Sequence, residues 1–397
     1  MTRKHLCWSF VVLLAFTLSC DKRSPEKRDA FFAEGKEAFS AGEYRKAEIA
    51  FKNAVQQDPQ FAPAHFRLGL TYLEEKQPRK AYTALMNAVQ LDPSMEKARI
   101  KLGELLVVMR EYAKAIEQAD KVIEKHPENL EARLIRAVGY RGVHKRDAAI
   151  EELEYILEKD PDNARAHVTL ATILLDMSQL EAAEAHLQKA LSLDPERVET
   201  HLTLAQLYTR RKDLESAQRH LRKAVELRPD DPMMRGMLVQ FLLSRGETDA
   251  AERVLTEGIE RHPDAPEPYL ALGEFYALQG KLDAAEENYR KALEKDPDSI
   301  PARIKLAEHA INTKDFEGAE RLLAEIAQKA PGHYAVPFLY GRIDLIRKRF
   351  DAAAESFRKV VNLVPDFSRG HLFLGRAYYM QHDFQNAKSE ILRALEL

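Results

Sequence analysis

Ten prolines recur at a constant spacing of 34 residues along this chain of 397 residues. They are Pro59, Pro93, Pro127, Pro161, Pro195, Pro229, Pro263, Pro297, Pro331 and Pro365. A constant step without insertions predicts that one supersecondary unit has been copied end to end. Such an array offers a long surface for binding, and its uniform step leaves no room for an inserted catalytic loop.

Other residues recur with the same period when each unit is numbered so that its proline is position 32. Position 20 is alanine in all eleven copies, position 8 is Gly or Ala in ten, and position 24 is large and apolar in ten. Small residues at 8 and 20 allow two helices to approach closely, and the residue at 24 fills the space beside them. Apolar residues follow the helical period in each half, and breakers such as Arg245-Gly246-Glu247 separate the halves. Each unit is therefore predicted to be a helical hairpin that ends at its proline.

These features resemble the tetratricopeptide repeat (TPR), which has small residues at 8, 20 and 27, apolar residues at 7, 11 and 24, and proline at 32. The resemblance covers residues 28–397 and implies an all-α fold, a right-handed α-solenoid of eleven tandem hairpins after an N-terminal signal segment. The expected units are 28–61, 62–95, 96–129, 130–163, 164–197, 198–231, 232–265, 266–299, 300–333, 334–367 and the incomplete 368–397. Position 4, often tryptophan in the family, differs throughout. It holds Phe31, His65, Arg99, Arg133, His167, His201, Arg235, Tyr269, Arg303, Pro337 and His371.

The first 20 residues form a different kind of segment. Two basic residues precede an apolar run at 6–18, which has the length of a signal-peptide core and is shorter than the roughly 20 residues of a membrane span. The run ends at Thr17-Leu18-Ser19-Cys20, which resembles a bacterial lipoprotein signal with Cys20 as the lipidated first residue of the mature protein. Thr17 departs from that pattern, which prefers leucine there. An ordinary cleaved signal and an uncleaved anchor remain the alternatives.

We therefore expect a signal peptide at 1–19, a short linker at 20–27 and a protein that faces the periplasm in the cell envelope. By the same resemblance Asp21 favours retention at the inner membrane, and the choice between inner and outer membrane stays open. Lipid anchoring would bring the first hairpin close to the bilayer, because two or three acyl chains hold a protein firmly.

Composition gives little support for other classes of function. The net charge of −3 and the lack of a lysine- or arginine-rich block argue against nucleic-acid binding. The only cysteines are Cys7 and Cys20, so we expect no disulfide framework. We also expect no metal and no cofactor, because no zinc-ligand spacing, phosphate-binding loop or nucleophile elbow is present. The acidic pairs are typical of a solvated surface, so the chain is not predicted to be an enzyme.

In the resembling family the first helix of each hairpin lines a concave groove, chiefly through positions 2, 5, 9, 12 and 13. Position 5 is apolar in ten copies and position 9 is mostly polar, which favours an extended peptide or a partner helix as ligand. An alternative is that position 5 only packs against the neighbouring hairpin. The candidate groove residues are Phe32, Lys36, Phe66, Ile100, Glu104, Leu134, Val168, Leu202, Gln206, Leu270, Ile304, Phe338, Arg342, Leu372 and Arg376. Gly236 is the one exception at position 5.

The predicted function is an exported, membrane-anchored scaffold that binds protein or peptide partners at the bacterial envelope. It is similar to the repeat lipoproteins that accompany exopolysaccharide export and protein sorting in PEP-CTERM/exosortase systems. The alternatives are an assembly factor for a pilus or secretion pore, and the regulatory arm of an enzyme whose catalytic domain lies beyond residue 397. The next proline of the 34-residue series would fall at 399, and no capping helix follows. We therefore expect a fragment of a longer array, and the alternative is an end that docks on a partner or on a second copy.

Overall fold

The structure, a computed structural model, describes residues 24–397, and these residues form 22 α-helices without a strand. The all-α repeat fold predicted from the sequence is confirmed. The expected signal segment and the first half of the linker, including Cys20, lie outside the described residues.

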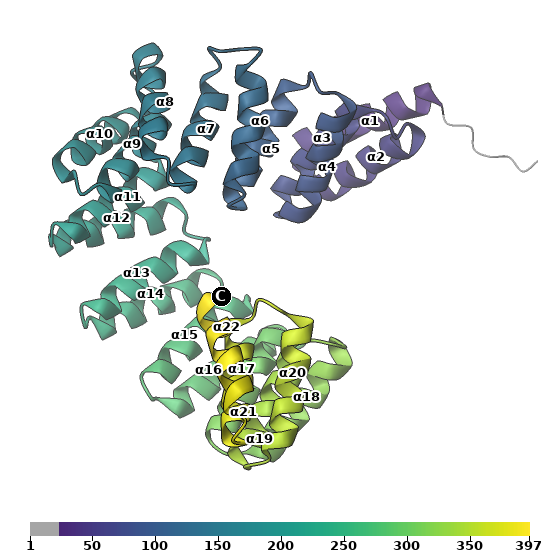
Figure 1. The fold of residues 1–397 in the computed structure, drawn as a ribbon, viewed down its shortest axis with the longest axis vertical. Helices are drawn as coiled ribbons and strands as arrows, with labels where there is room; N and C mark the ends of the chain where they lie inside the picture. The colour runs from purple at the N-terminus through teal and green to yellow at the C-terminus, as the bar shows by residue number, and fades with distance from the viewer. Residues whose placement is uncertain (1–23) are drawn as a thin grey trace, which may run out of the picture. The chain divides into compact units, whose positions relative to one another are not determined.

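The chain divides into two compact units, the first ending at Asp213 and the second beginning at Leu214. The first contains α1 (Pro25–Ser40), α2 (Tyr44–Gln57), α3 (Ala62–Glu74), α4 (Pro78–Leu91), α5 (Glu96–Val108), α6 (Tyr112–Ile123), α7 (Leu130–Gly142), α8 (Arg146–Lys159), α9 (Ala164–Asp176), α10 (Leu180–Leu193) and α11 (Val198–Arg210). The second contains α12 (Leu214–Leu227), α13 (Pro232–Ser244), α14 (Thr248–Arg261), α15 (Pro266–Leu278), α16 (Leu282–Lys295), α17 (Ile300–Asn312), α18 (Phe316–Lys329), α19 (Ala335–Ile346), α20 (Phe350–Leu363), α21 (Ser368–Met380) and α22 (Phe384–Glu396). Within each unit the helices follow one another as hairpins (Figure 1).

The small residues at positions 8 and 20 allow the two helices of a hairpin to touch. Every alanine of position 20 is at most 2% exposed. A Cβ atom added to Gly35 would lie 2.5 Å from the ring of Phe51, and one added to Gly341 would lie 2.7 Å from the ring of Phe357. Because real Cβ contacts are longer than this, the large residue at position 24 needs the small residue at position 8 opposite it.

The turn inside each hairpin places position 15 in the left-handed region of the backbone in all eleven copies. Three copies have glycine there, and the other eight have Lys76, Arg110, His144, Ser178, Lys212, Lys314, Lys348 and His382, with φ between 57° and 65°. In the first hairpin the N–H of Gly42 donates to the carbonyl of Phe39, and the N–H of Glu43 donates to the carbonyl of Ala38. A left-handed residue with these bonds ends a helix by satisfying its last carbonyls.

The turn between hairpins is held by the residue at position 4. In nine hairpins its side chain donates a hydrogen bond to the carbonyl of the proline six residues earlier, which is position 32 of the preceding unit. The donors are His65, Arg99, Arg133, His167, His201, Arg235, Tyr269, Arg303 and His371, at 2.6–3.2 Å. Histidine, arginine and tyrosine all supply an N–H or O–H at the end of a planar group, which explains why chemically different residues share this position. The tenth hairpin, with Pro337, has no such donor.

Candidate binding surfaces

The apolar residues of position 5 are less accessible than a binding floor would require. Buried members are Ile100, Leu134, Val168 and Phe338, and half-buried members are Phe32, Phe66, Leu202, Leu270 and Ile304. Only Leu372, 47% exposed, presents a large part of its side chain to solvent. Much of this row is therefore occupied by packing between helices, and the apolar area left for a ligand is small.

The polar residues of position 9 lie on the same first helices and are more accessible. Lys36, Gln206 and Arg376 are exposed, whereas Glu104 and Arg342 are half-buried. Glu104 pairs with Lys101 at 2.7 Å and with Arg165 at 3.6 Å.

The row of position 9 carries a charge network in the second unit. Lys305 lies 2.6 Å from Glu274 and 3.6 Å from Glu308, and Glu308 lies 3.6 Å from Arg342. Arg342 also donates to the side-chain oxygen of Asn312 at 3.0 Å. Burial lowers the pKa of the Arg342 guanidinium, Glu308 raises it and Arg369 lowers it further. This network joins α15, α17 and α19, so the row combines helix-to-helix contacts with the accessible polar edge that the sequence predicts.

A cavity lies beside Gly236, the glycine that replaces the apolar residue at position 5. No atom outside the helix lies within 4 Å of the place where a Cβ of Gly236 would stand. A cavity of about 340 Å³ occupies this region, with Leu255, Pro268 and Ala271 in its wall. The missing side chain thus accounts for the space.

A larger cleft of about 980 Å³ opens between α18, α19 and α20, and we call it the tenth-hairpin cleft. In several hairpins position 4 also reaches the side chain at position 23 of its own second helix, as Arg133 does to Glu152 at 2.9 Å. The tenth hairpin has Pro337 and Ser356 at these positions, and both line the cleft. Neither side chain can span the gap between the helices, so the space stays open.

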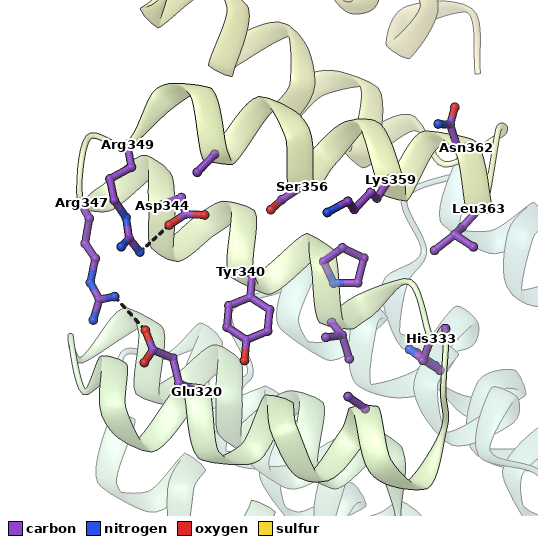
Figure 2. A pocket seen from close by; sticks show the side chains of 15 residues that line it. Glu320, His333, Tyr340, Asp344, Arg347, Arg349, Ser356, Lys359, Asn362 and Leu363 are labelled. Atoms are coloured by element: carbon purple, nitrogen blue, oxygen red, sulfur yellow. Dashed lines mark hydrogen bonds and ion pairs between the residues drawn. The ribbon is translucent and has the colours of Figure 1, made fainter.

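The cleft contains a buried carboxylate where the other hairpins have an alanine, leucine or tyrosine. Asp344 is at position 11 and is 8% exposed. Arg349 pairs with it at 2.5 Å, and Arg347 pairs with Glu320 at 2.7 Å. Figure 2 shows these two ion pairs at one end of the cleft. A buried carboxylate needs such a partner, because removing a charge from water is costly unless it is paired.

The other end of the cleft has a mixed lining that includes Lys359 and Asn362 (Figure 2). Leu363 and His333 lie there, and Tyr340 stands between them and the ion pairs (Figure 2). Burial raises the pKa of the Tyr340 hydroxyl, and the negative charge of Glu320 raises it further. The phenol therefore stays protonated and can donate a hydrogen bond. An opening with ion pairs at one end and a mixed polar and apolar lining at the other can accept side chains of a docking segment.

The sequence prediction missed this cleft. The repeat pattern marks Pro337 only as a departure from the family, and it does not single out Asp344 or Ser356. The detectable signal is that positions 4, 11 and 23 depart together in one copy. One departure alone would not predict a cleft. Together, the three departures remove the side-chain contact between positions 4 and 23 and add a buried carboxylate at position 11.

Two further properties concern only the residues that the structure describes. Between Ser24 and Leu397, no three His, Cys, Asp or Glu side chains are arranged to hold a metal ion. No helix in this range is long and apolar enough to cross a membrane. Cys20, the predicted lipidation site, lies outside the range.

Family models identify the class of protein. The model described as the C-terminal domain of cilia and flagella-associated protein 70 matches residues 101–337, which is more than half of the chain. The model described as the tetratricopeptide repeat matches residues 32–96 and 347–397. The chain therefore belongs to the tetratricopeptide-repeat family, and it is a scaffold of the type that binds other proteins.

Several solved structures are similar to this chain at low sequence identity. Yeast Tom70 is 14% identical over 91% of this chain and 96% of its own, with a TM-score of 0.47. A thermophilic TPR protein of Thermus thermophilus is 21% identical over 46% of this chain and 99% of its own, with a TM-score of 0.43. MamA of Desulfovibrio magneticus is 17% identical over 43% of this chain and 97% of its own, with a TM-score of 0.40. No curated protein matches the chain.

Proposed function

We propose that this protein is an exported, lipid-anchored scaffold that holds protein partners at the bacterial envelope, in a system for exopolysaccharide export or protein sorting. The repeat family supports the scaffold. The observation that supports its partner-binding face is the accessible polar row at position 9, beside the partly covered apolar row at position 5. The signal peptide predicted at 1–19 supports the proposed location.

Lipid anchoring at Cys20 is tested by metabolic labelling with palmitate in a bacterial host. Wild-type protein should incorporate label and sediment with membranes, whereas Cys20→Ala should do neither, because thioether attachment requires the sulfur. Cys7→Ala is the matched control, since that residue lies inside the segment expected to be removed, and it should label like wild type. Equal labelling of wild type and Cys20→Ala would refute anchoring at this residue.

The binding face is tested by site-specific photo-crosslinking in cells. A photoreactive residue at Leu372 or Gln206 reports on the exposed part of positions 5 and 9, whereas Phe338 is too deeply buried to serve. The control is Arg222, an exposed residue on the second helix α12. Protein adducts from Leu372 and Gln206 that are absent from Arg222 support the proposed face. Adducts from Arg222 alone would place binding elsewhere.

A further inference from the structure

A cationic pocket of about 590 Å³ lies in the first unit, where the first helices α7, α9 and α11 approach their C-terminal ends. Arg141, Arg146, Arg210, His144 and Asp176 line it, and we call it the arginine pocket. Even with His144 neutral, three guanidinium groups face one carboxylate. The pocket therefore has an excess of positive charge and of hydrogen-bond donors.

The single carboxylate is shared loosely by two guanidinium groups. Nε and Nη2 of Arg141 each lie 3.4 Å from Oδ2 of Asp176, and Nη2 of Arg210 lies 3.7 Å from Oδ1. Close guanidinium–carboxylate bonds are about 2.7–2.9 Å long. The space between Arg141 and Arg210 therefore holds a carboxylate, and the long distances leave the N–H groups of both guanidinium groups only partly engaged. Its side chain is 37% exposed, so the place is open to solvent.

Helix ends account for two of these cations and leave the third unexplained. Arg141 and Arg210 are in the last turns of their helices, where the macrodipole favours positive charge, and Arg210 also donates to the carbonyl of Leu175. Arg146 is the first residue of α8, where the macrodipole disfavours positive charge. Its side chain has neither a hydrogen bond nor an ion pair with any residue in 24–397. Because Arg146 is exposed, an external anion can reach it.

An aromatic side chain also lines the pocket. Tyr112 packs directly on Gly142, whose added Cβ would lie 2.3 Å from the ring. Glycine at this position keeps the ring pressed against α7. A lining that combines apolar side chains such as Tyr112 and Val138 with guanidinium groups suits a glutamate side chain, whose methylene groups are apolar and whose carboxylate pairs with cations.

We propose that the arginine pocket binds the carboxylates of an acidic segment in a partner protein. This inference rests on the proposed scaffold function and specifies the chemistry of one partner. The place held by Asp176 shows that a carboxylate fits between Arg141 and Arg210, and Arg146 offers a second contact point. The volume is within the range of about 300–1,000 Å³ typical of ligand pockets and leaves space for more than one side chain.

The test uses the full protein and a fluorescein-labelled hexaglutamate peptide, with binding followed by fluorescence anisotropy. Arg146→Gln should weaken binding about three- to tenfold, because it removes one charge contact at an accessible site. Asp176→Asn should tighten binding about threefold, because the internal carboxylate no longer competes for the same guanidinium groups. Arg79→Gln, which changes an exposed arginine near the start of another second helix of the same unit, should leave binding unchanged. Affinity should fall as salt rises from about 50 to 300 mM.

The gain expected from Asp176→Asn separates a binding site from a structural ion pair. If the pair were only structural, Asp176→Asn would weaken or leave unchanged the binding of hexaglutamate, and the inference would be wrong. Displacement of the peptide by polygalacturonate but not by unlabelled hexaglutamate would also overturn it, in favour of an acidic polysaccharide. If hexaglutamate fails to bind while adducts from Leu372 and Gln206 persist, the arginine pocket is rejected and the scaffold proposal stands.

Discussion

The residue at position 4 links the first helix of its hairpin to the proline at position 32 of the preceding hairpin. The proline ends one hairpin, and its carbonyl then accepts a hydrogen bond from the first helix of the next. Arg303 illustrates the arrangement, because it is only 6% exposed and donates to the carbonyls of Pro297 and Ser299. Buried donors and acceptors that lose their partners destabilise a protein more than the bond itself stabilises it.

Replacing Arg303 with methionine should therefore lower the free energy of unfolding by about 1–3 kcal/mol, since the volume is retained and the donors are lost. Urea unfolding followed by circular dichroism measures the change. Arg290→Met, on the exposed side of α16, should change stability by less than about 0.5 kcal/mol. Equal stability of Arg303→Met and wild type would show that the proline carbonyl does not need this donor.

A pair of histidines is expected to make the fifth hairpin sensitive to pH. His167 donates from Nε2 to the carbonyl of Pro161, so its Nδ1 accepts from Nδ1 of His186 at 2.9 Å. Burial lowers the pKa of His186, and charge on His167 lowers it further. Below a pH of about 6.5 the unfolded chain therefore binds a proton that the folded chain excludes. Stability is present above that pH and is lost as pH falls toward the lowered folded pKa.

His186→Gln should reduce the loss of stability between pH 7.5 and 5.5, because the residue that resists protonation is gone. Each unit by which the pKa is lowered corresponds to about 1.4 kcal/mol. The unfolding midpoint in urea at the two pH values measures the difference. His382→Asn, at an exposed histidine, should keep the pH dependence of wild type. A pH dependence that His186→Gln leaves intact would assign it to other groups.

At the scale of the helical element, the turn inside each hairpin is more uniform than its sequence. The glycines of three copies indicate a breaker, and the structure shows the same left-handed residue in the other eight. A left-handed backbone costs a residue with a Cβ about 1–2 kcal/mol. Each of these eight hairpins is therefore less stable than it would be with glycine at position 15.

Ser178→Gly should raise the free energy of unfolding by about 0.5–1 kcal/mol, and Gly246→Ser should lower it by a similar amount. Thermal unfolding of the two variants measures both signs in one experiment. The result would contradict the assignment if both variants moved in the same direction.

Sequence reasoning succeeded where a rule repeats and failed where one copy departs from it. Position 20 predicted a helix contact and is buried in every copy. Position 4 could not be interpreted in the same way, because its hydrogen bond depends on a donor atom that histidine, arginine and tyrosine carry at different distances from the backbone. The tenth-hairpin cleft was missed because a cavity arises from what Pro337 and Ser356 lack, and only the packed neighbours reveal that.

At the scale of the whole molecule, stability is expected to be local. In a repeat array each hairpin contacts chiefly its neighbours, so its stability is a sum of nearby terms. The clusters of buried residues follow this rule, since the cluster around Leu187 lies in the first unit and the cluster around Leu323 lies in the second.

Leu187→Ala should therefore weaken hydrogen-exchange protection in α9 and α10 while leaving α18 to α20 unchanged, and Leu323→Ala should do the reverse. Both leucines are fully buried, and such truncations cost about 2–5 kcal/mol. Exchange measured by mass spectrometry resolves the two regions. Loss of protection across both units from either variant would mean that the chain unfolds as a single cooperative body.

The hydrogen bond from position 4 to the proline at position 32 of the preceding hairpin limits which amino acids position 4 can hold in the different hairpins. A comparison by residue identity would rank this site among the least constrained, because it holds five different amino acids in the eleven hairpins. A comparison by chemistry would rank it among the most constrained, because nine of those hairpins make the same bond. An engineer exchanging hairpins between arrays should therefore match donor groups at this site, whichever amino acid supplies them.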